Sequence, residues 1–255
     1  MPLSIDQRSD HGPFDVIGDV HGCIDELREL IVRLGGTAER GEVARPAPGR
    51  RMVFLGDLVD RGPDSAGVLR LVMNMAAVGE ALVLPGNHDD KLRRALLGHK
   101  VLIKAGLDGT LAQLESEPPE FRGQVVRFLD SLPSHFIFDE GRLVVAHGGL
   151  AEELQGRDSL RARAFALYGL PSGEVDLDGL PIRLQWALHY HGRALVIFGH
   201  TPVAGPLRLN HTVNIDTGCV YGGSLTAYRY PEHETVSVPA RMTYSKRKTP
   251  WRPEA

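Results

Sequence analysis

Five short polar motifs carry the residues of this chain that are best suited to chemistry. They read GDVHG (18–22), GDLVDRGPDS (56–65), GNHDD (86–90), AHGG (146–149) and GHTP (199–202). Together they offer two carboxylates, one amide oxygen and three imidazoles, from Asp19, His21, Asp57, Asn87, His147 and His200. Donors of these kinds suit manganese, iron, zinc or nickel. The motifs therefore predict a metal centre, and six such side chains can hold two ions with positions left open for water and substrate.

No single motif establishes this centre, because an isolated pair such as Asp19 and His21 is more often an ordinary polar turn than a pair of ligands. The occurrence of five such motifs in one chain is what favours a metal centre. All five motifs directly follow a short apolar run, and each contributes a compatible donor. Loops at the carboxyl ends of strands converge on ligands in α/β sheets, and the adjoining glycines permit tight turns there.

The elements that must position these donors alternate in the first ninety residues. Apolar runs at 14–17, 52–55 and 81–84 predict strands, and amphipathic or apolar stretches at 25–34 and 64–78 predict helices between them. This order is typical of parallel βαβ units. A polar surface loop is expected over 36–50, a helix is expected after the GNHDD motif, and the stretch over about 107–132 is expected to be helical.

The second half is richer in predicted strands. A hairpin is expected over 135–149 and strands over 194–200, 212–218, 224–230 and 235–238. We expect one domain over residues 1–255, with a core of about 12–240 and a polar tail over 241–255. The overall class is therefore α/β.

Composition limits where the protein can act. The longest apolar runs fall far short of the roughly 20 residues of a membrane span, and the N-terminus lacks the pattern of a secretory signal. These features predict a cytoplasmic protein with no membrane contact. A net charge of −3 gives no general basic field, so any contact with nucleic acid must be local. Two cysteines, Cys23 and Cys219, are too few for a disulfide framework, and we expect both to be reduced and packed.

In this order the five motifs resemble the calcineurin-like metallophosphoesterases, and specifically their phosphoprotein-phosphatase-type branch. The resemblance covers about residues 14–230 and implies a β-sandwich of two mixed sheets flanked by helices. It also implies two divalent transition metals, with Mn²⁺ foremost and Ni²⁺, Fe or Zn as alternatives. One ion would be held by Asp19, His21 and Asp57. The second would be held by Asp57, Asn87, His147 and His200, so that Asp57 is the bridge.

Charge then suggests the reaction. Two divalent ions with Asp19 and Asp57 leave a surplus of two positive charges, which suits a phosphate monoester and a hydroxide bridging the ions. That hydroxide would attack phosphorus. His88, next to Asn87, is the expected general acid that protonates the leaving group, with Asp60 holding its imidazole; the alternative is that His88 only supports the ligands.

Further groups are expected to meet the substrate phosphate. Arg61 can bind its oxygens bidentately, with a surface salt bridge as the alternative. Arg183 is a weaker second candidate, and Asn87 is expected to contact phosphate as well as metal. Asp216 is expected to support the centre from behind the ligands, and its alternative is a turn aspartate that caps its own backbone.

Longer stretches point to a substrate class by resemblance. Segments such as LPGNHDDKLRRALLG, GLPIRLQWA and GHTPVAGPLRLNHTVNIDTGCVYGGSLTAYRYPE closely resemble the phosphatase module of bacterial polynucleotide kinase-phosphatases. This implies a polynucleotide phosphatase that removes 3′- or 2′-phosphates from RNA or DNA ends in RNA repair, or opens 2′,3′-cyclic phosphates. In that family the module lies between kinase and ligase-like domains of a longer chain, whereas this sequence has no P-loop motif. Arg157, Arg161 and Arg163 are candidate contacts for such ends.

Three other functions remain open at this stage. Symmetric diadenosine tetraphosphate hydrolases share the opening motif but commonly have a non-acidic residue where Asp60 stands. Small Ser/Thr protein phosphatases share all five motifs. A binding module that keeps the metals without turnover is disfavoured, because binding alone would not require His88 and Asp60. The sequence does not indicate an oligomeric state.

Overall fold

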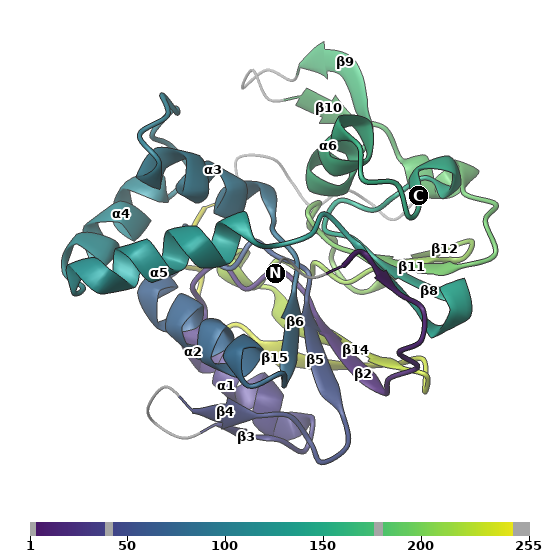
Figure 1. Cartoon of the computed structure of the whole chain (residues 1–255), viewed down its shortest axis with the longest axis horizontal. Coiled ribbons are helices and arrows are strands. Elements are labelled where there is room, and N and C mark those ends of the chain that lie inside the picture. Colours follow the sequence, from purple (N-terminus) through teal and green to yellow (C-terminus); the bar gives the residue numbers. More distant parts are fainter. Residues whose placement is uncertain (1–3, 39–42, 176–180, 247–255) are drawn as a thin grey trace.

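The computed structural model describes residues 4–38, 43–175 and 181–246. Within them, two mixed β-sheets pack face to face and helices cover their outer faces (Figure 1). This arrangement confirms the predicted α/β sandwich of two mixed sheets flanked by helices.

The five-stranded sheet contains the predicted βαβ units. Its order is β15-β14-β2-β5-β6. Strands β2, β5 and β6 are parallel to one another, and β14 pairs antiparallel with both β2 and β15. The strands are β2 (Phe14–Ile17), β5 (Arg51–Phe54), β6 (Ala81–Val83), β14 (Ser224–Tyr230) and β15 (Glu234–Pro239). The connecting helices are α1 (Ile24–Arg33) and α2 (Ser65–Ala77), close to their predicted bounds.

The six-stranded sheet has the order β1-β7-β8-β11-β13-β12. Its strands are β1 (Asp6–Gln7), β7 (Phe136–Phe138), β8 (Leu143–Val145), β11 (Leu195–Phe198), β12 (Leu207–Leu209) and β13 (Thr212–Asn214). The antiparallel pair β7 and β8, joined by the short helix η1 (Asp139–Gly141), confirms the predicted hairpin. Strands β8, β11 and β13 run parallel, so their carboxyl ends share one edge.

Alternation along the strands builds the core between the sheets. Phe14 and Val16 of β2 point to the interface with the six-stranded sheet, whereas Ile17 packs on the helical side. The same period of two, which follows from the pleat of a strand, places Val145 inside and Val144 outside in β8. Each sheet is therefore buried on both faces, and its loops are left to carry function.

The helical region beside α2 confirms the helical character predicted for about 107–132. It consists of two helices, α4 (Leu107–Glu115) and α5 (Pro119–Asp130), and they follow α3 (Asn87–Leu96). Pro118 is extended, with φ −53° and ψ 140°. A residue before proline is driven out of the helical region and proline has no N–H to donate, so Pro118 and Pro119 separate the helices.

Smaller elements complete the chain. The predicted loop over 36–50 contains a short antiparallel pair. That pair is β3 (Thr37–Ala38) and β4 (Ala44–Arg45), and it contacts α1 and α2. The remaining elements are η2 (Glu152–Leu154), α6 (Leu160–Tyr168), β9 (Pro171–Val175), β10 (Pro181–Arg183), η3 (Trp186–His189) and η4 (Cys219–Tyr221).

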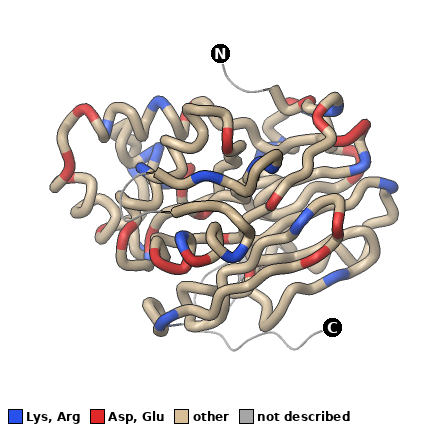
Figure 2. The backbone as a smooth tube through the Cα atoms, turned by 90° about the horizontal axis from the view of Figure 1, so that it is seen from below, with Lys and Arg blue, Asp and Glu red and all other residues tan. Residues whose placement is uncertain are grey.

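The start of the predicted polar tail is held against α1. The backbone N–H of Arg241 and the hydroxyl of Tyr244 both donate to Oε1 of Glu26, at 2.9 and 2.7 Å. Residues 247–255 lie outside the described residues. Figure 2 shows acidic and basic residues interspersed along the backbone. Among the described helices, none is both long and apolar enough to span a membrane.

Candidate metal centre

The predicted donors follow the carboxyl ends of strands from both sheets. Asp19 and His21 come after β2, Asp57 after β5 and Asn87 after β6. From the six-stranded sheet, His147 follows β8 and His200 follows β11. Because the two sheets pack face to face, these loops meet at one edge of the sandwich, near α3 and α6 in Figure 1.

Asp57 lies between two groups of donor atoms. Its Oδ2 is 3.5 Å from Nε2 of His21, and its Oδ1 is 3.5 Å from Nε2 of His147. It belongs both to a group with His21 and His88 and to a group with His147 and His200, each with donor atoms within 4.8 Å of one another. One buried carboxylate shared by two donor groups is the arrangement that a binuclear centre needs.

The charge state of Asp57 suits this position. Burial raises the pKa of its carboxyl, but the surrounding imidazoles, His147 foremost, outweigh burial and hold that pKa well below its usual range. The group is therefore an anion that can accept cations on both oxygens.

The second donor group converges on one point. Nε2 of His147 lies 3.3 Å from Oδ1 of Asn87 and 3.0 Å from Nδ1 of His200. The two imidazole rings meet at 71° with centroids 4.9 Å apart. An amide oxygen and two ring nitrogens gathered around one position fit a transition-metal ion.

The first group is oriented by the backbone. Nδ1 of His21 donates to the carbonyl of Val59 at 2.8 Å, which leaves Nε2 as the nitrogen that can ligate. The carboxylate of Asp19 instead accepts the N–H of His200 at 3.1 Å. Burial, then the charges of Asp216 and Asp57, raise the pKa of Asp19 well above its usual range. Asp19 thus ties the two sheets together, and its role as a ligand beside His21 stays a prediction.

Several of these loops hold non-glycine residues in the left-handed region. His21, Asp57, Asp60, Arg61 and His200 have φ of 46°, 48°, 74°, 72° and 70°. Such backbone is uncommon outside glycine and is concentrated at functional sites, where the rest of the structure stabilises it. Here part of that stabilisation is visible, because the N–H groups of His21 and Gly22 donate to the carbonyls of Asp57 and Leu58 at 2.8 and 2.9 Å.

The predicted acid pair is in direct contact. Nδ1 of His88 lies 2.6 Å from Oδ2 of Asp60, and both side chains are buried. The hydroxyl of Thr110 donates to the other oxygen of Asp60 at 2.7 Å. The backbone N–H of His88 also donates to Oδ1 of Asp57 at 2.9 Å. The pair is thus fixed beside Asp57, while its role in proton transfer stays a prediction.

Arg61 and Arg183 are the two arginines predicted to bind the substrate phosphate. Nη1 of Arg61 lies 2.7 Å from Nε2 of His21, and its guanidinium stacks over the ring of Tyr221 at 5.4 Å. Arg61 therefore reaches the donor cluster, where an anionic substrate would meet it. Arg183 lies in β10, but its side chain is outside the described residues.

Asp216 makes the contact expected of a turn aspartate, while its supporting role stays a prediction. Its Oδ1 accepts the N–H of Gly218 at 3.0 Å, as expected of a turn aspartate. It also lies close enough to Asp19 for its charge to raise the pKa of that carboxyl. Among the candidate contacts for nucleic acid, Arg161 and Arg163 face acidic partners, Glu153 at 3.8 Å and Asp90 at 3.9 Å.

Two supporting residues were missed in the sequence. The buried carboxylate of Asp89 accepts the N–H groups of Leu58 and Gly86 at 3.0 and 2.8 Å, which joins the loops after β5 and β6. Asp89 stands three residues after Gly86, the spacing of a capping box, so the sequence could have indicated that its side chain bonds to the start of α3. Thr110 had no local signal, because it lies fifty residues from Asp60.

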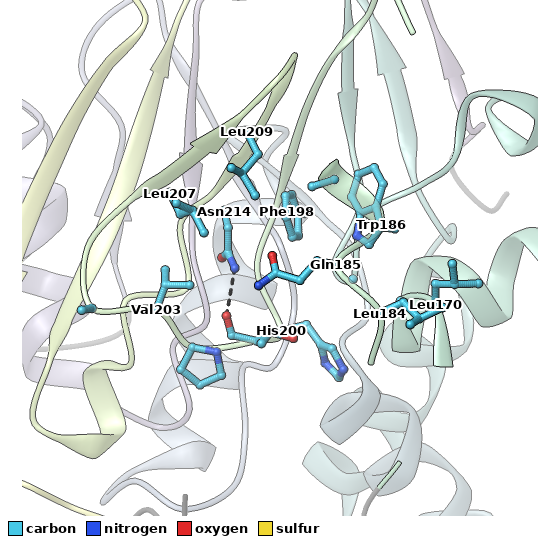
Figure 3. Close-up of a pocket in the computed structure, with 16 residues that line it drawn as sticks. Leu170, Leu184, Gln185, Trp186, Phe198, His200, Val203, Leu207, Leu209 and Asn214 are labelled. Carbon is cyan, nitrogen blue, oxygen red and sulfur yellow. Dashed lines mark hydrogen bonds between the residues drawn. The ribbon is translucent and has the colours of Figure 1, made fainter. Parts of the chain in front are cut away.

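Both cysteines are buried and free, as expected. Together with Glu26 they form a separate group of donor atoms within 4.8 Å of one another, near the start of α1. A narrow apolar hollow also reaches the metal centre. Figure 3 shows His200 at one end of it, with Phe198, Leu207 and Leu209 toward the other.

The fold and the paired donor groups define a class of protein. Residues 12–204 match the family model described as calcineurin-like phosphoesterase, and the chain belongs to that family. The metal centre is therefore one of a family of divalent-metal hydrolases, although the identity of the metals is not fixed by the donors.

Individual relatives narrow the comparison. A bis(5′-nucleosyl)-tetraphosphatase PrpE from Anoxybacillus flavithermus, described as asymmetrical, is 45% identical over 91% of this chain and 96% of its own length. Its counterpart from Bacillus subtilis is 44% identical over 91% of this chain and 97% of its own. A solved structure described provisionally as a diadenosine tetraphosphatase has a TM-score of 0.67 and 25% identity, and covers 94% of this chain and 99% of its own.

These relatives correct the predicted substrate family. They do not support the closest resemblance to polynucleotide kinase-phosphatases, nor RNA repair, and their names say asymmetrical where the alternative prediction was symmetric. A yeast Ser/Thr phosphatase, with a TM-score of 0.63 and 15% identity over 94% of this chain and 84% of its own, shares the fold. Two of the quoted stretches, LPGNHDDKLRRALLG and GHTPVAGPLRLNHTVNIDTGCVYGGSLTAYRYPE, carry the donors Asn87 and His200, so they report on the metal centre more than on the substrate.

Proposed function

We propose that this chain is a metal-dependent hydrolase that cleaves the phosphoanhydride chain of a bis(5′-nucleosyl) tetraphosphate unevenly. The observation that carries the proposal is the 45% identity to an asymmetrical tetraphosphatase over nearly the whole of both chains. Four phosphates divided unevenly within the chain give a nucleoside monophosphate and a nucleoside triphosphate. An anhydride between phosphates thus replaces the phosphate monoester expected from the sequence.

The donor groups fit the metals that this chemistry needs. Two divalent ions, Mn²⁺ foremost, would be held by the groups that share Asp57, with Asp19 completing the first. When bound, such ions neutralise phosphate charge and activate water. The buried anion of Asp57 fixes where that positive charge is placed.

The remaining residues orient the substrate and handle a proton. Because Nδ1 of His88 is engaged by Asp60, the proton for the leaving phosphate oxygen would reside on Nε2. Arg61, held over Tyr221 beside His21, would bind the phosphate undergoing attack. Thr110 keeps Asp60 in place through a hydrogen bond of 2.7 Å.

A competition among substrates tests the proposal. Initial rates with Mn²⁺ would be compared for diadenosine tetraphosphate, a 3′-phosphorylated oligonucleotide and a phosphoserine peptide at matched concentrations. We expect the highest kcat/KM for diadenosine tetraphosphate, with adenosine mono- and triphosphate as the products on chromatography.

Two results would overturn the proposal. Two molecules of adenosine diphosphate would show a symmetric cut. A higher kcat/KM for the oligonucleotide or the peptide would return the chain to one of the functions first considered. Chelation with EDTA serves as the control, since it should stop every metal-dependent reaction in the set.

A further inference from the structure

Large apolar side chains that are more than one-third exposed gather beside the metal centre. They lie at the end of α6, before β9 and around η3, and are Tyr168 (38% exposed), Leu170 (37%), Leu184 (51%) and Leu188 (43%). A single exposed leucine needs no explanation, but a contiguous apolar patch often marks a binding site. All four side chains line hollows in this region.

Two hollows adjoin each other across the segment from Leu184 to Trp186, and their volumes separate their roles. The narrow one, which ends at His200, has about 60 Å³ and has room for only a few water molecules. The wide one has about 800 Å³, within the roughly 300–1,000 Å³ of small-molecule sites. The wide hollow therefore has the volume of an organic-ligand site.

The wide hollow has an aromatic wall and a polar margin. It lies between η2, α6 and η3 and includes Phe165, Tyr168 and Trp186. The indole of Trp186 meets the ring of Phe165 edge-on at 5.7 Å, which fixes this wall. His189 and His191 also line it. A flat aromatic ligand with a polar edge matches such walls.

Direct packing connects this hollow to the metal centre. The N–H of Gly148, next to the donor His147, donates to the carbonyl of Ala166 in α6 at 2.5 Å. A Cβ on Gly148 would lie only 2.6 Å from the backbone nitrogen of Gly169, and one on Gly149 only 2.0 Å from the indole of Trp186. The walls of the hollow therefore rest on the loop that carries His147.

We infer that the wide hollow binds the nucleoside nearer to the cleaved bond, with its base stacked on Tyr168 and against Leu184 and Leu188. The choice of a nucleoside rests on the proposed function. Because Gly148 and Gly149 pack against α6 and Trp186, a base in this hollow would lie beside the loop that carries His147, and a short phosphate link would lead from it to the metals. The hollow would then select which bond is cut, because it places the first phosphate, not the middle of the chain, at the donors.

Binding measurements isolate the base from the phosphate. Calorimetry with the Mn²⁺-loaded protein would compare adenosine 5′-monophosphate with ribose 5-phosphate, which lacks the base. We expect adenosine monophosphate to bind at least about tenfold more tightly, the order of one stacked base. Tyr168→Ala should remove most of that preference, and Tyr168→Phe, which keeps the ring, should retain it.

Leu160→Ala is the matched control, since Leu160 begins the same helix, is 88% exposed and does not line the hollow. It should keep the full preference. Equal affinities for the two ligands in the unaltered protein, or an undiminished preference in Tyr168→Ala, would overturn the inference. A strong preference without cleavage of diadenosine tetraphosphate would instead retain the hollow and remove the proposed function.

Discussion

The loops of the five-stranded sheet and those of the six-stranded sheet supply the centre in different ways. On the five-stranded side, the loops after β2, β5 and β6 are bonded to one another. His21 donates to Asp57 through the backbone, and Asp89 accepts from both Leu58 and Gly86. On the six-stranded side, the loop of His147 is braced mainly by α6 and Trp186, which also form the wide hollow.

This difference separates two tasks. On the five-stranded side, hydrogen bonds among the loops after β2, β5 and β6 hold the shared carboxylate and the His88–Asp60 pair in place. Such a fixed arrangement suits chemistry that is common to many substrates. The six-stranded side contributes ligands from loops whose supports face an open hollow. Substitutions in the residues that line this hollow can change the substrate without moving the donors on the five-stranded side, since function resides in sites built onto a fold.

The largest expected effect comes from the residue that joins the two sides. Asp57→Asn removes the shared anion while keeping its size, so both ions should bind poorly and turnover should fall by at least about 10³-fold. Rates with p-nitrophenyl phosphate and metal content by atomic emission would be measured. Asp108→Asn, at an exposed position of α4, is the matched control. Full occupancy by two ions with near-normal turnover would refute the shared carboxylate.

A smaller loss is expected within the five-stranded side. His88→Ala should slow phenyl phosphate by about 10²-fold but p-nitrophenyl phosphate far less, because only the poorer leaving group needs a proton. The measurement is kcat for both esters with saturating Mn²⁺. Equal losses on the two esters would mean that the His88 side chain only supports the site through its contact with Asp60 and transfers no proton.

The smallest effect concerns the stability of the six-stranded side in acid. Burial lowers the pKa of His135, before β7, from 6.5 to about 4, and its Nε2 accepts the N–H of Gly156 at 3.0 Å. The unfolded chain therefore binds more protons than the folded one between these values, so stability is lost as pH falls from 6.5 toward 4. At pH 4.5 this loss should be roughly 2–3 kcal/mol.

Denaturant unfolding at pH 7 and 4.5 would measure this loss. His135→Gln, which offers an acceptor without titrating, should show a smaller decrease in the free energy of unfolding over the same interval. An identical decrease in both proteins would show that His135 does not cause the acid sensitivity.

The sequence was most informative where function is local. Each predicted donor adjoins a glycine turn after an apolar run, so the meeting of Asp57, His147 and His200 could be expected from the strand order. The helical character of 107–132 could be predicted, and Pro118 with Pro119 was the available signal for the break between α4 and α5.

Other features had no local pattern. Thr110 reaches Asp60 only because α4 packs beside α2. The wide hollow is built from ordinary apolar residues of separate segments, such as Tyr168 and Leu188, and no spacing connects them. The substrate could not be predicted for the same reason, since the motifs surround the donors and not the surface that distinguishes ligands.

The left-handed backbone at His21, Asp57, Asp60, Arg61 and His200 has a consequence for the history of such chains. Each of these residues costs about 1–3 kcal/mol that glycine would relieve. A lineage released from selection for catalysis would gain stability by replacing them, and glycine should accumulate at these five positions before the core changes.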